Sequence, residues 1–404
     1  MTRKILAPLV AALLVVGVGF AGAAQAYTPE SEARFNDPSG TRAQENTSMI
    51  HIRKTIRSAR KNSIIRIASY THNRADVTDA LLDVCRQRNV SVQIVLNDNH
   101  TSQTTKRLIR VLGTNTEPHW KDACNPRKKP DDPSSTKEPH PDPSFVKICY
   151  QSCRKGAGNQ HMKFFLFSST GAAQNVVMLG STNTTRWAAR VHFNDLFTET
   201  GRAAMFRDYS KIHAELARDR RVRNPYWKVR HGDLVTEFGG VVRRGSRDPV
   251  AKRLAAVSCA GGTTIRIAMY AWTGDRGLYL ARRVADLRRR GCTVRVILSG
   301  ASSDVTTALR NGGVAMRSAD MDLDGRSDTG FGDTRWDRFT HEKWMALDGT
   351  WNGSRQKIVW TGSENWSGLG YINDEVTIMI PRAGIHGAYA RHFEFMWNNR
   401  TRSF

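Results

Sequence analysis

The chain has 404 residues, of which 40% are hydrophobic, so it can bury a core as one large domain or two ordinary ones, and this argues against a disordered protein. Its 61 Lys and Arg residues outnumber 37 Asp and Glu, and the formal net charge is +24. Such a charge favours polyanionic partners, namely nucleic acid, anionic lipid surfaces or teichoic polymers, but does not identify a reaction. The alternative is a basic surface that serves solubility alone.

The first 26 residues have the pattern of a secretory signal peptide. Arg3 and Lys4 form a positive start, an apolar stretch runs from Ile5 to Phe20, and the small-residue cleavage site AQA ends at Ala26. A membrane anchor is the alternative, because the apolar stretch approaches the length of a membrane span. We expect a secreted, soluble protein whose net charge falls from +24 to +22 once Arg3 and Lys4 are removed.

Two sets of strands and helices follow one another along the chain. The apolar run Ile64–Ile67 predicts a buried strand, residues 76–88 a helix with an arginine-rich outer face, and Ser91–Leu96 a second strand. The same order returns in 265–267, 277–290 and 293–298. Strand, helix and strand at this spacing predict a parallel α/β sheet in each half.

These elements belong to an internal repeat. IIRIASY at Ile64 returns as TIRIAMY at Thr264, and SVQIVL at Ser91 returns as TVRVIL at Thr293. The patterns HxK and GSxN also occur twice, in the same order. Four matches in one order indicate two copies of one unit. We expect a signal peptide over residues 1–26, a first lobe over 27–240 and a second lobe over 241–404.

Each copy carries an insertion of its own. Residues 119–145 in the first copy are rich in proline and charge, which predicts an exposed loop. In the second copy, DMDLDG from Asp320 to Gly325 begins like a calcium loop, but Phe331 stands at the twelfth position, where such a loop has glutamate. We expect an acidic turn there and no metal.

All six cysteines lie beyond the expected signal peptide, and their even number suits disulfides in an exported protein. Cys259 and Cys292 each precede an apolar run of what we predict to be neighbouring strands, so we expect these two to pair. The spacing of Cys149 and Cys153 also suits a metal, but an oxidising compartment favours a disulfide.

His161 and Lys163, and again His341 and Lys343, are two residues apart, so each pair shares one face of a strand. A neutral imidazole can attack the phosphorus of a phosphodiester, while an ammonium group neutralises the non-bridging oxygens. A second imidazole can protonate the leaving alkoxide, so this chemistry needs both copies. The GSxN segments add hydroxyl and amide groups that we expect to bind phosphate: Ser181, Asn183, Ser363 and Asn365.

The second copy, His341-x-Lys343-x4-Asp348 followed by GSEN from Gly362, resembles the HxKxxxxD and GSxN motifs of the phospholipase D superfamily. Through the repeat the resemblance extends over nearly all of the mature chain. It implies an α/β fold of two similar lobes related by a pseudo-twofold axis, with the active site at their interface. It also implies a phosphohistidine intermediate and no metal or other cofactor.

By the same resemblance the catalytic residues are His161, Lys163, His341, Lys343 and Asp348. Similar enzymes use the histidine of the first copy as nucleophile, which implies that role for His161 and the role of acid for His341. The first copy departs from the motif, because Ser168 stands where the pattern has aspartate. This position of a strand faces away from the histidine and lysine, so its residue supports the site from behind.

Each histidine needs a partner that fixes its tautomer. Counting 34 residues beyond each histidine reaches Asp195 and Glu375, in the matching stretches FNDLFT and INDEVT. Aligning these stretches by Asn-Asp instead places Asp195 opposite Asp374, so the alignment stays open. The alternative is that both acids cap strand ends.

The motifs predict the reaction class better than the substrate. Export and the tryptophans beside the motifs, Trp187, Trp344 and Trp366, favour a phospholipid at a membrane surface. The positive charge favours nucleic acid as the alternative partner. A binder of phosphate polymers without catalysis is a third, weaker interpretation. We expect a monomeric, secreted phospholipase D.

Overall fold

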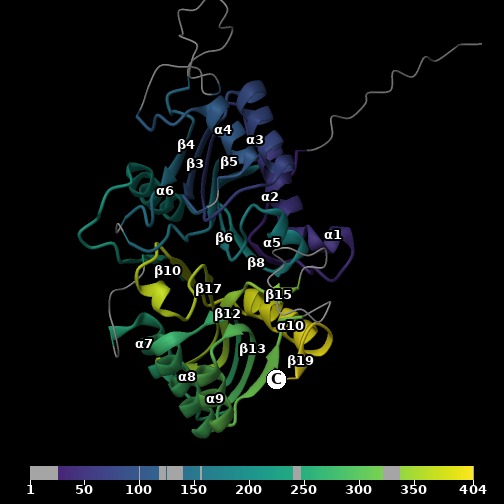
Figure 1. Cartoon of the computed structure of the whole chain (residues 1–404), viewed down its shortest axis with the longest axis vertical. Helices are drawn as coiled ribbons and strands as arrows, with labels where there is room; N and C mark the ends of the chain where they lie inside the picture. Colours follow the sequence, from purple (N-terminus) through teal and green to yellow (C-terminus); the bar gives the residue numbers. More distant parts are fainter. Residues whose placement is uncertain are drawn as a thin grey trace, which may run out of the picture.

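The computed structural model describes residues 26–99, 101–117, 124, 140–154, 157–239, 247–321 and 337–403. Residues 1–25 of the expected signal peptide, most of the first insertion and the calcium-like segment from residue 322 onward lie outside these ranges. Figure 1 shows two α/β lobes, one above the other along the long axis of the molecule. Among the described helices, none has the length and apolar character that crossing a membrane requires.

Within the described residues, the first lobe has a seven-stranded mixed sheet in the order β1-β8-β6-β5-β2-β3-β4. Its strands are β1 (Glu32–Phe35), β2 (Ile64–Ser69), β3 (Ser91–Asn97), β4 (Phe145–Cys149), β5 (Phe164–Thr170), β6 (Ala173–Gly180) and β8 (Asp195–Glu199), with the short β7 (His192–Phe193) apart from it. Its helices are α1 (Arg42–Glu45), α2 (Thr47–Arg57), α3 (Ala75–Arg88), α4 (Gln103–Leu112), α5 (Arg186–Arg190) and α6 (Ala203–Arg218).

The described part of the second lobe has a ten-stranded sheet in the order β19-β14-β13-β12-β16-β17-β18-β10-β9, with β11 beside β16. The strands are β9 (Trp227–His231), β10 (Leu234–Phe238), β11 (Val257–Ser258), β12 (Thr264–Trp272), β13 (Thr293–Ala301), β14 (Ala315–Ser318), β16 (Lys343–Trp351), β17 (Ser354–Gly362), β18 (Val376–Ile380) and β19 (Arg402–Ser403), with β15 (Phe339–Thr340) apart. The helices are α7 (Pro249–Ala255), α8 (Gly274–Arg289), α9 (Ser303–Asn311), the 3₁₀ helix η2 (Gly368–Tyr371) and α10 (Ala383–Asn399).

The two sheets repeat one arrangement. The order β6-β5-β2-β3-β4 corresponds to β17-β16-β12-β13-β14, with parallel pairs β2·β3 and β12·β13 and antiparallel pairs β2·β5 and β12·β16. The predicted fold class of two similar α/β lobes is confirmed, but the parallel sheet predicted for each half is wrong, because β5 and β16 pair antiparallel to their neighbours and make both sheets mixed. The sheets divide the chain before residue 240, because β10 pairs with β18 and β9 pairs with β10, so that both strands extend the second sheet.

Helices cover both faces of each sheet. In the first lobe α2, α3 and α4 enclose one apolar core, and α6 encloses another that includes Phe164, Phe197 and, from the second lobe, Val376. In the second lobe α7, α8 and α9 cover the outer face, while α10 covers Trp344 and Phe193. The inner cores therefore contain side chains of both lobes, which hold the lobes against one another.

All six cysteines are paired in disulfides. The predicted bond between Cys259 and Cys292 is confirmed. The other two bonds join Cys85 to Cys124 and Cys149 to Cys153. The first of these attaches the insertion of the first copy to α3.

Candidate active site between the lobes

The segments that carry the two motif histidines cross from one lobe to the other. The strand β15, just before His341, pairs in parallel with β7 of the first lobe, and the His341 amide donates to the carbonyl of Phe193 at 2.9 Å. Likewise Gln160 forms a bridge with Asp374 of the second lobe, and the His161 amide donates to the Asp374 carbonyl at 3.0 Å. Each histidine is therefore fixed by the backbone of the opposite lobe.

The imidazole of His161 is held by Glu375. Its Nδ1 lies 2.9 and 3.0 Å from the two carboxylate oxygens, and both residues are buried. The carboxylate also accepts hydrogen bonds from the Ser363 hydroxyl and from the Asn373 amide, the latter at 3.0 Å. The structure thus places the sequence-predicted Glu375 beside a histidine, and it is the histidine of the other copy.

The imidazole of His341 is held by Asn194 and not by Asp195. Its Nδ1 lies 3.0 Å from Asn194 Oδ1. Asp195 faces the other way, accepting from the Tyr389 hydroxyl at 2.7 Å and from Thr361. The expectation that Asp195 orients a histidine is therefore corrected: consecutive residues of an extended chain point to opposite sides, and Asp195 is one residue too far.

The serines of the two GSxN segments hold these orienting residues. The Ser181 hydroxyl donates to Asn194 Oδ1 at 3.0 Å, and the Ser363 hydroxyl donates to Glu375. Each hydroxyl also accepts from the backbone amide that follows the orienting residue. The expected contact of Ser181 and Ser363 with phosphate is corrected accordingly, because their hydroxyl groups are occupied by these partners.

The asparagines of GSxN remain candidates for phosphate binding. Asn183 accepts a hydrogen bond from Ser69 at 3.3 Å, and Asn365 Oδ1 is buried without a partner. Within the described part of the chain, the side-chain NH₂ groups of Asn183 and Asn365 make no hydrogen bond. These amides can donate to the non-bridging oxygens of a phosphodiester.

The two lysines have matching environments. Lys163 Nζ donates to the His161 carbonyl at 2.7 Å and lies 5.5 Å from the ring centre of Tyr70. Lys343 Nζ donates to the His341 carbonyl and lies 4.9 Å from the ring centre of Tyr270. Each ammonium keeps further N–H groups for a substrate anion. The tyrosines come from the repeated IASY and IAMY strands, and each ring also contacts the histidine of its own lobe.

The charges of the site act on one another across the lobe boundary. Burial lowers the pKa of Lys163 to about 7, and burial together with Lys163 lowers the pKa of Lys343. The pKa of His341 is lowered by burial, by Lys343 and, across the boundary, by Lys163 and His161. A bound phosphodiester anion would attract these positive groups and stabilise their charged forms, so the site suits an anionic ligand.

Asp348 does not join this cluster. It lies on β16, five residues beyond Lys343, which is about 16 Å along a strand, and it forms ion pairs with Lys357 at 2.9 Å and Arg355 at 3.6 Å. Ser168, at the equivalent position, accepts from the Ile64 amide at 2.9 Å. The catalytic role expected for Asp348 is therefore corrected to a structural one.

The sequence interpretation missed Asn194, the two tyrosines and His192. The ring of His192 stacks on His341 with centroids 4.7 Å apart and planes at 20°. Its pKa is lowered to about 3 by burial and by Lys343, so the ring is neutral. The repeated final tyrosine of IASY and IAMY was a usable signal, whereas His192 has no counterpart in the second copy.

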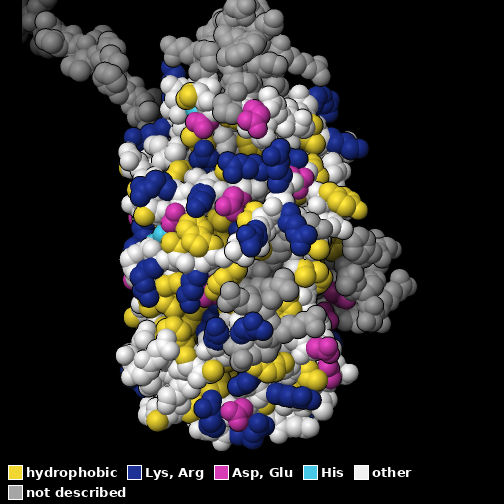
Figure 2. Space-filling model, turned by 90° about the vertical axis from the view of Figure 1, so that its left-hand side faces the viewer, with side chains coloured by type: hydrophobic (Ala, Val, Ile, Leu, Met, Phe, Trp, Pro, Cys, Tyr) yellow, Lys and Arg dark blue, Asp and Glu magenta, His cyan; other side chains and the backbone are white. Residues whose placement is uncertain are grey.

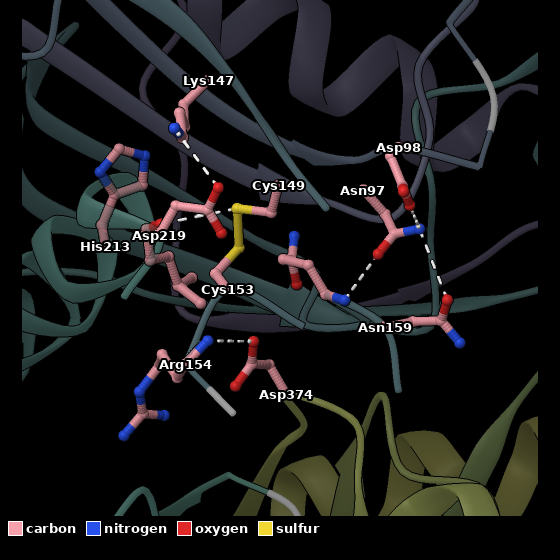
Figure 3. Close-up of a disulfide and its surroundings, with 12 residues drawn as sticks. Asn97, Asp98, Lys147, Cys149, Cys153, Arg154, Asn159, His213, Asp219 and Asp374 are labelled. Carbon is pink, nitrogen blue, oxygen red and sulfur yellow. Dashed lines mark hydrogen bonds and ion pairs between the residues drawn. A yellow bond between two sulfur atoms is a disulfide. The ribbon is translucent and has the colours of Figure 1, made fainter. Parts of the chain in front are cut away.

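The bond between Cys149 and Cys153 supports the His161 segment (Figure 3). It closes a short loop after β4, and the next residue, Arg154, donates its amide to Asp374 Oδ2 at 3.2 Å. Asp374 in turn accepts the His161 amide through its carbonyl. Asn97, at the end of β3, accepts the Gln160 amide at 2.8 Å on the other side. The disulfide therefore fixes one end of the contact that positions His161.

Replacing Cys149 and Cys153 with alanine should lower kcat by up to about 10²-fold, because displacing a reacting group by about 1 Å can cost that much. The free energy of unfolding should fall by only about 2 kcal/mol, since the closed loop is short. Replacing Cys259 and Cys292 is the matched control: its longer loop predicts a loss of about 4 kcal/mol with unchanged kcat. Equal kcat for the two folded variants would contradict a positioning role of the first disulfide.

Comparison with protein families matches the model described as "Cardiolipin synthase, PLD-like domain" over residues 52–216 and 256–397, one segment in each lobe. Comparison with curated proteins gives no significant match.

Solved structures with TM-scores above 0.5 share the fold. Phosphatidylserine synthase from Haemophilus influenzae Rd KW20 is 13% identical, with 92% of this chain and 87% of that chain covered and a TM-score of 0.57. Polyphosphate kinase from Porphyromonas gingivalis is 11% identical over 91% of this chain, with a TM-score of 0.52, and this chain spans only 50% of its length. Nuc from Salmonella typhimurium, a phospholipase D family member, is 17% identical over 42% of this chain and 98% of its own, with a TM-score of 0.29.

Proposed function

The chain belongs to the phospholipase D superfamily, and we propose that within it the protein is a secreted, monomeric phospholipase D that hydrolyses the head-group phosphodiester of phospholipids. Phosphodiester chemistry is the common property of this superfamily. The observation that carries the proposal is the convergence of two His-x-Lys pairs at the lobe boundary, with each histidine held by the opposite lobe.

The residues of the site divide the reaction between them. One imidazole attacks phosphorus through its Nε2 and forms a phosphohistidine, while the other donates a proton to the leaving alcohol and later activates water. Lys163 and Lys343 neutralise the charge that develops on the non-bridging oxygens, and the amides of Asn183 and Asn365 add hydrogen bonds. In this proposal, side chains fill each of these roles and none of them requires a metal ion.

Exposed apolar side chains near the site support a lipid substrate. Tyr150 and Leu369 are 74% and 53% exposed, the highest values among large hydrophobic residues in the described chain. Tyr150 begins the disulfide loop, whose Gln151 carbonyl accepts the Gln160 amide, and the Leu369 carbonyl accepts the Asn373 amide. Both loops thus adjoin the contact between His161 and Asp374, where they can meet the apolar part of a lipid surface.

The tryptophans support a lipid substrate less than the sequence suggested. Trp344 and Trp366 are 1% and 3% exposed and pack in the cores of the second lobe, so they cannot reach a membrane. Trp187, on α5, is half-buried. The lipid proposal therefore depends on the loops that carry Tyr150 and Leu369.

A nuclease is the second candidate, favoured by the charge of the chain. Figure 2 shows lysine and arginine side chains spread over both lobes, with few acidic side chains among them. Such a surface attracts the backbone phosphates of nucleic acid without reading a sequence. It also attracts anionic lipid, so charge alone does not choose between the two substrates.

The two candidates are separated by incubating the mature protein with phosphatidylcholine vesicles and, in parallel, with plasmid DNA, both in EDTA. Release of choline supports the lipid proposal, and nicking of DNA supports the nuclease. Lys163→Met serves as the control for contaminating enzymes, because it should abolish the genuine activity. Absence of both activities from a folded protein would reject the proposed phosphodiesterase.

Leu369→Asp should reduce hydrolysis of vesicles by about 10-fold or more, because it places a charge where burial in lipid would be worth about 2 kcal/mol. Hydrolysis of a soluble p-nitrophenyl phosphodiester should stay within about twofold of wild type, since the Leu369 side chain is 53% exposed and the residue bonds to Asn373 through its backbone carbonyl. Phe395→Asp, on the exposed side of α10, is the matched control and should leave both rates unchanged. Equal losses on both substrates would assign Leu369 to the catalytic geometry.

A further inference from the structure

We infer that the second lobe carries a binding site for a phosphorylated aromatic molecule, of the class of a nucleoside monophosphate, apart from the motif histidines. The site is a cavity of about 580 Å³ between the hairpin of β9 and β10 and the helix α7. The elements α7 and β10 lie at the left of the molecule in Figure 1. Pockets that bind small molecules usually have volumes of roughly 300–1,000 Å³. Among the described residues that line the cavity, none belongs to an HxK or GSxN motif, so the inference does not rest on the proposed function.

The register of the second sheet gives the cavity an apolar floor. Val235 of β10 pairs with Met379 of β18, and Met379 pairs with Trp360 of β17. Because residues that are directly opposite on neighbouring strands point to the same face, the three side chains form a row. Arg230 of β9, the partner of Val235, continues this row at the edge of the sheet. The apolar floor therefore ends at a cation.

Helix α7 forms the opposite wall, and its last turn is fixed to the sheet. The indole Nε1 of Trp351 donates to the Arg253 carbonyl at 3.1 Å, and the Asn352 amide donates to the Ala256 carbonyl at 3.0 Å. Trp351 and Tyr226 both line the cavity and are half-buried, so each ring keeps some surface for a ligand. Aromatic side chains bind a planar ring by offset stacking or edge-to-face contact.

The buried cation of the cavity, Arg253, has unused hydrogen-bonding capacity. The residue is 6% exposed, and its guanidinium carbon lies 5.4 Å from the ring centre of Trp360. It pairs with Glu237, but Nη2 lies 3.6 Å from Oε2, which is too long for a hydrogen bond. Within the described residues the buried Nη2 has no hydrogen-bond partner. A buried donor without a partner is costly, so an oxygen of a ligand that accepts from it is favoured.

The charges around the cavity favour an anion. Glu237 is the one acid among the described residues that line it, and it lies 3.3 Å from Lys228 and 3.6 Å from Arg253. The cations among these residues are Lys228, Arg230, Arg247, Lys252 and Arg253. One carboxylate neutralises one of these five charges, so the cavity favours a ligand with more than one negative charge. A phosphomonoester carries about −1.5 to −2 charges at pH 7, and guanidinium groups bind its oxygens in a bidentate manner.

The apolar floor and the cations together select the class of ligand. Inorganic phosphate would contact the cations but leave the row of Val235, Met379 and Trp360 without a partner. A hydrocarbon chain would cover this row, but it matches the flat rings of Trp351 and Tyr226 less well than another ring does. A nucleoside monophosphate satisfies both parts, because its phosphate meets the arginines while its base packs against the aromatic side chains.

Calorimetric titration with adenosine monophosphate (AMP), inorganic phosphate and adenosine tests the inference. We expect one AMP site per chain, with a Kd at least about 10-fold lower than that of phosphate or adenosine, because each half of the ligand contributes. Hydrogen exchange in the presence of AMP should slow in peptides that cover β9, β10 and α7. A Kd for AMP no lower than that for adenosine, or protection confined to other elements, would overturn the inference.

Variants of the cavity separate binding there from binding elsewhere. Arg253→Lys keeps the charge but loses the planar fork, and it should raise the Kd for AMP by about 10-fold. Because Arg253 is buried, thermal unfolding checks that this variant is folded. Arg230→Ala combined with Lys252→Ala changes only exposed side chains and should raise the Kd by a similar factor of about 10. An unchanged Kd in both variants would contradict the site.

The control variants remove charge at other places. Arg289→Ala combined with Arg290→Ala removes two exposed charges from α8 and should leave the Kd within about twofold of wild type. Lys163→Met should also bind AMP as wild type does, and loss of binding in it would place AMP at the motif histidines and overturn the inference. Octyl phosphate should bind at least about 10-fold more weakly than AMP. Equal affinity for the two would overturn the aromatic class of the ligand.

Discussion

Replacing His161, His341 or both with alanine should lower kcat/KM for the native phosphodiester by about the same factor, roughly 10³ to 10⁶. The reason is that both rings serve one reaction: without the nucleophile no phosphohistidine forms, and without the acid an alkyl alkoxide cannot leave. Groups that act as a unit do not contribute additively, so the double variant should be no worse than the poorer single variant.

Steady-state kinetics on the preferred substrate measure this effect. Lys357→Ala is the control, because Lys357 pairs with Asp348 on the exposed end of the sheet and should leave kcat/KM unchanged. A double variant that loses the product of the two single factors would mean that the histidines act independently. That result would contradict one site shared by the two lobes.

Each histidine variant needs a check of stability. Removal of the His161 ring leaves the buried Glu375 with Ser363 and Asn373 as partners, which costs stability as well as activity. His341→Ala leaves only a neutral amide behind. We therefore expect His161→Ala to unfold at a lower temperature than His341→Ala, although both variants are inactive.

The repeated α/β architecture could be predicted because the evidence for it is local. Apolar runs such as Ile64–Ile67 and Ile265–Ile267 define buried strands, and the intervening helices follow from their spacing. The pairing of Cys259 with Cys292 followed from the same strands, since both cysteines stand just before them. Packing and disulfide bonds between elements that are neighbours in the sequence can therefore be predicted from the order of the elements.

The partners of the histidines could not be predicted, because they cross between lobes. A fixed count of 34 residues reaches Glu375 from His341, yet Glu375 binds His161. The same count from His161 reaches Asp195, one residue beyond the true partner of His341. The distance from the GSxN serine to the orienting residue differs by one between the copies, from Ser181 to Asn194 and from Ser363 to Glu375.

The tryptophans and Asp348 illustrate a second limit. A residue that adjoins a motif in sequence can lie on the opposite face of its strand, as Trp344 does beside Lys343, and then it packs in the core. Asp348 completes the motif in sequence but lies several residues along β16, where its partners are Lys357 and Arg355. Proximity in sequence therefore identified the strand, but it did not identify which side chains face the substrate.

Arg276→Met should destabilise the protein by about 3–5 kcal/mol, the largest loss that we expect from removing one charge. The side chain of Arg276 is 1% exposed, its guanidinium lies 2.7 Å from both Asp248 and Glu364, and it also donates to the carbonyls of Asn365 and Ser367. It thereby joins α8 to the start of α7 and to the loop after β17. Without it, the two buried carboxylates lose the cation that they share.

Denaturant unfolding at neutral pH measures this loss, with Arg289→Ala as the control, because its pair with Asp286 is half exposed and worth less than about 1 kcal/mol. Adding Asp248→Asn and Glu364→Gln to Arg276→Met should restore part of the stability by removing the unpaired charges. A loss near that of Arg289→Ala would show that the buried network is dispensable.

The difference between wild type and Arg276→Met should also shrink in acid. Burial opposes ionisation of Asp248, but its hydrogen bonds and charge pairing with Arg276 hold its pKa below the ordinary value in the folded protein. A depressed pKa contributes stability that is present above the unfolded pKa of about 4 and is lost as the pH falls through the folded value. Wild type therefore loses this contribution in acid. In Arg276→Met, burial raises the pKa of Asp248 without the opposing effect of Arg276, so Asp248 takes up a proton at higher pH. The free energy of unfolding of the variant therefore falls less in acid than that of wild type. A difference that stays constant from pH 7 to pH 3 would place the effect of Arg276 in packing, and charge would then have no part in it.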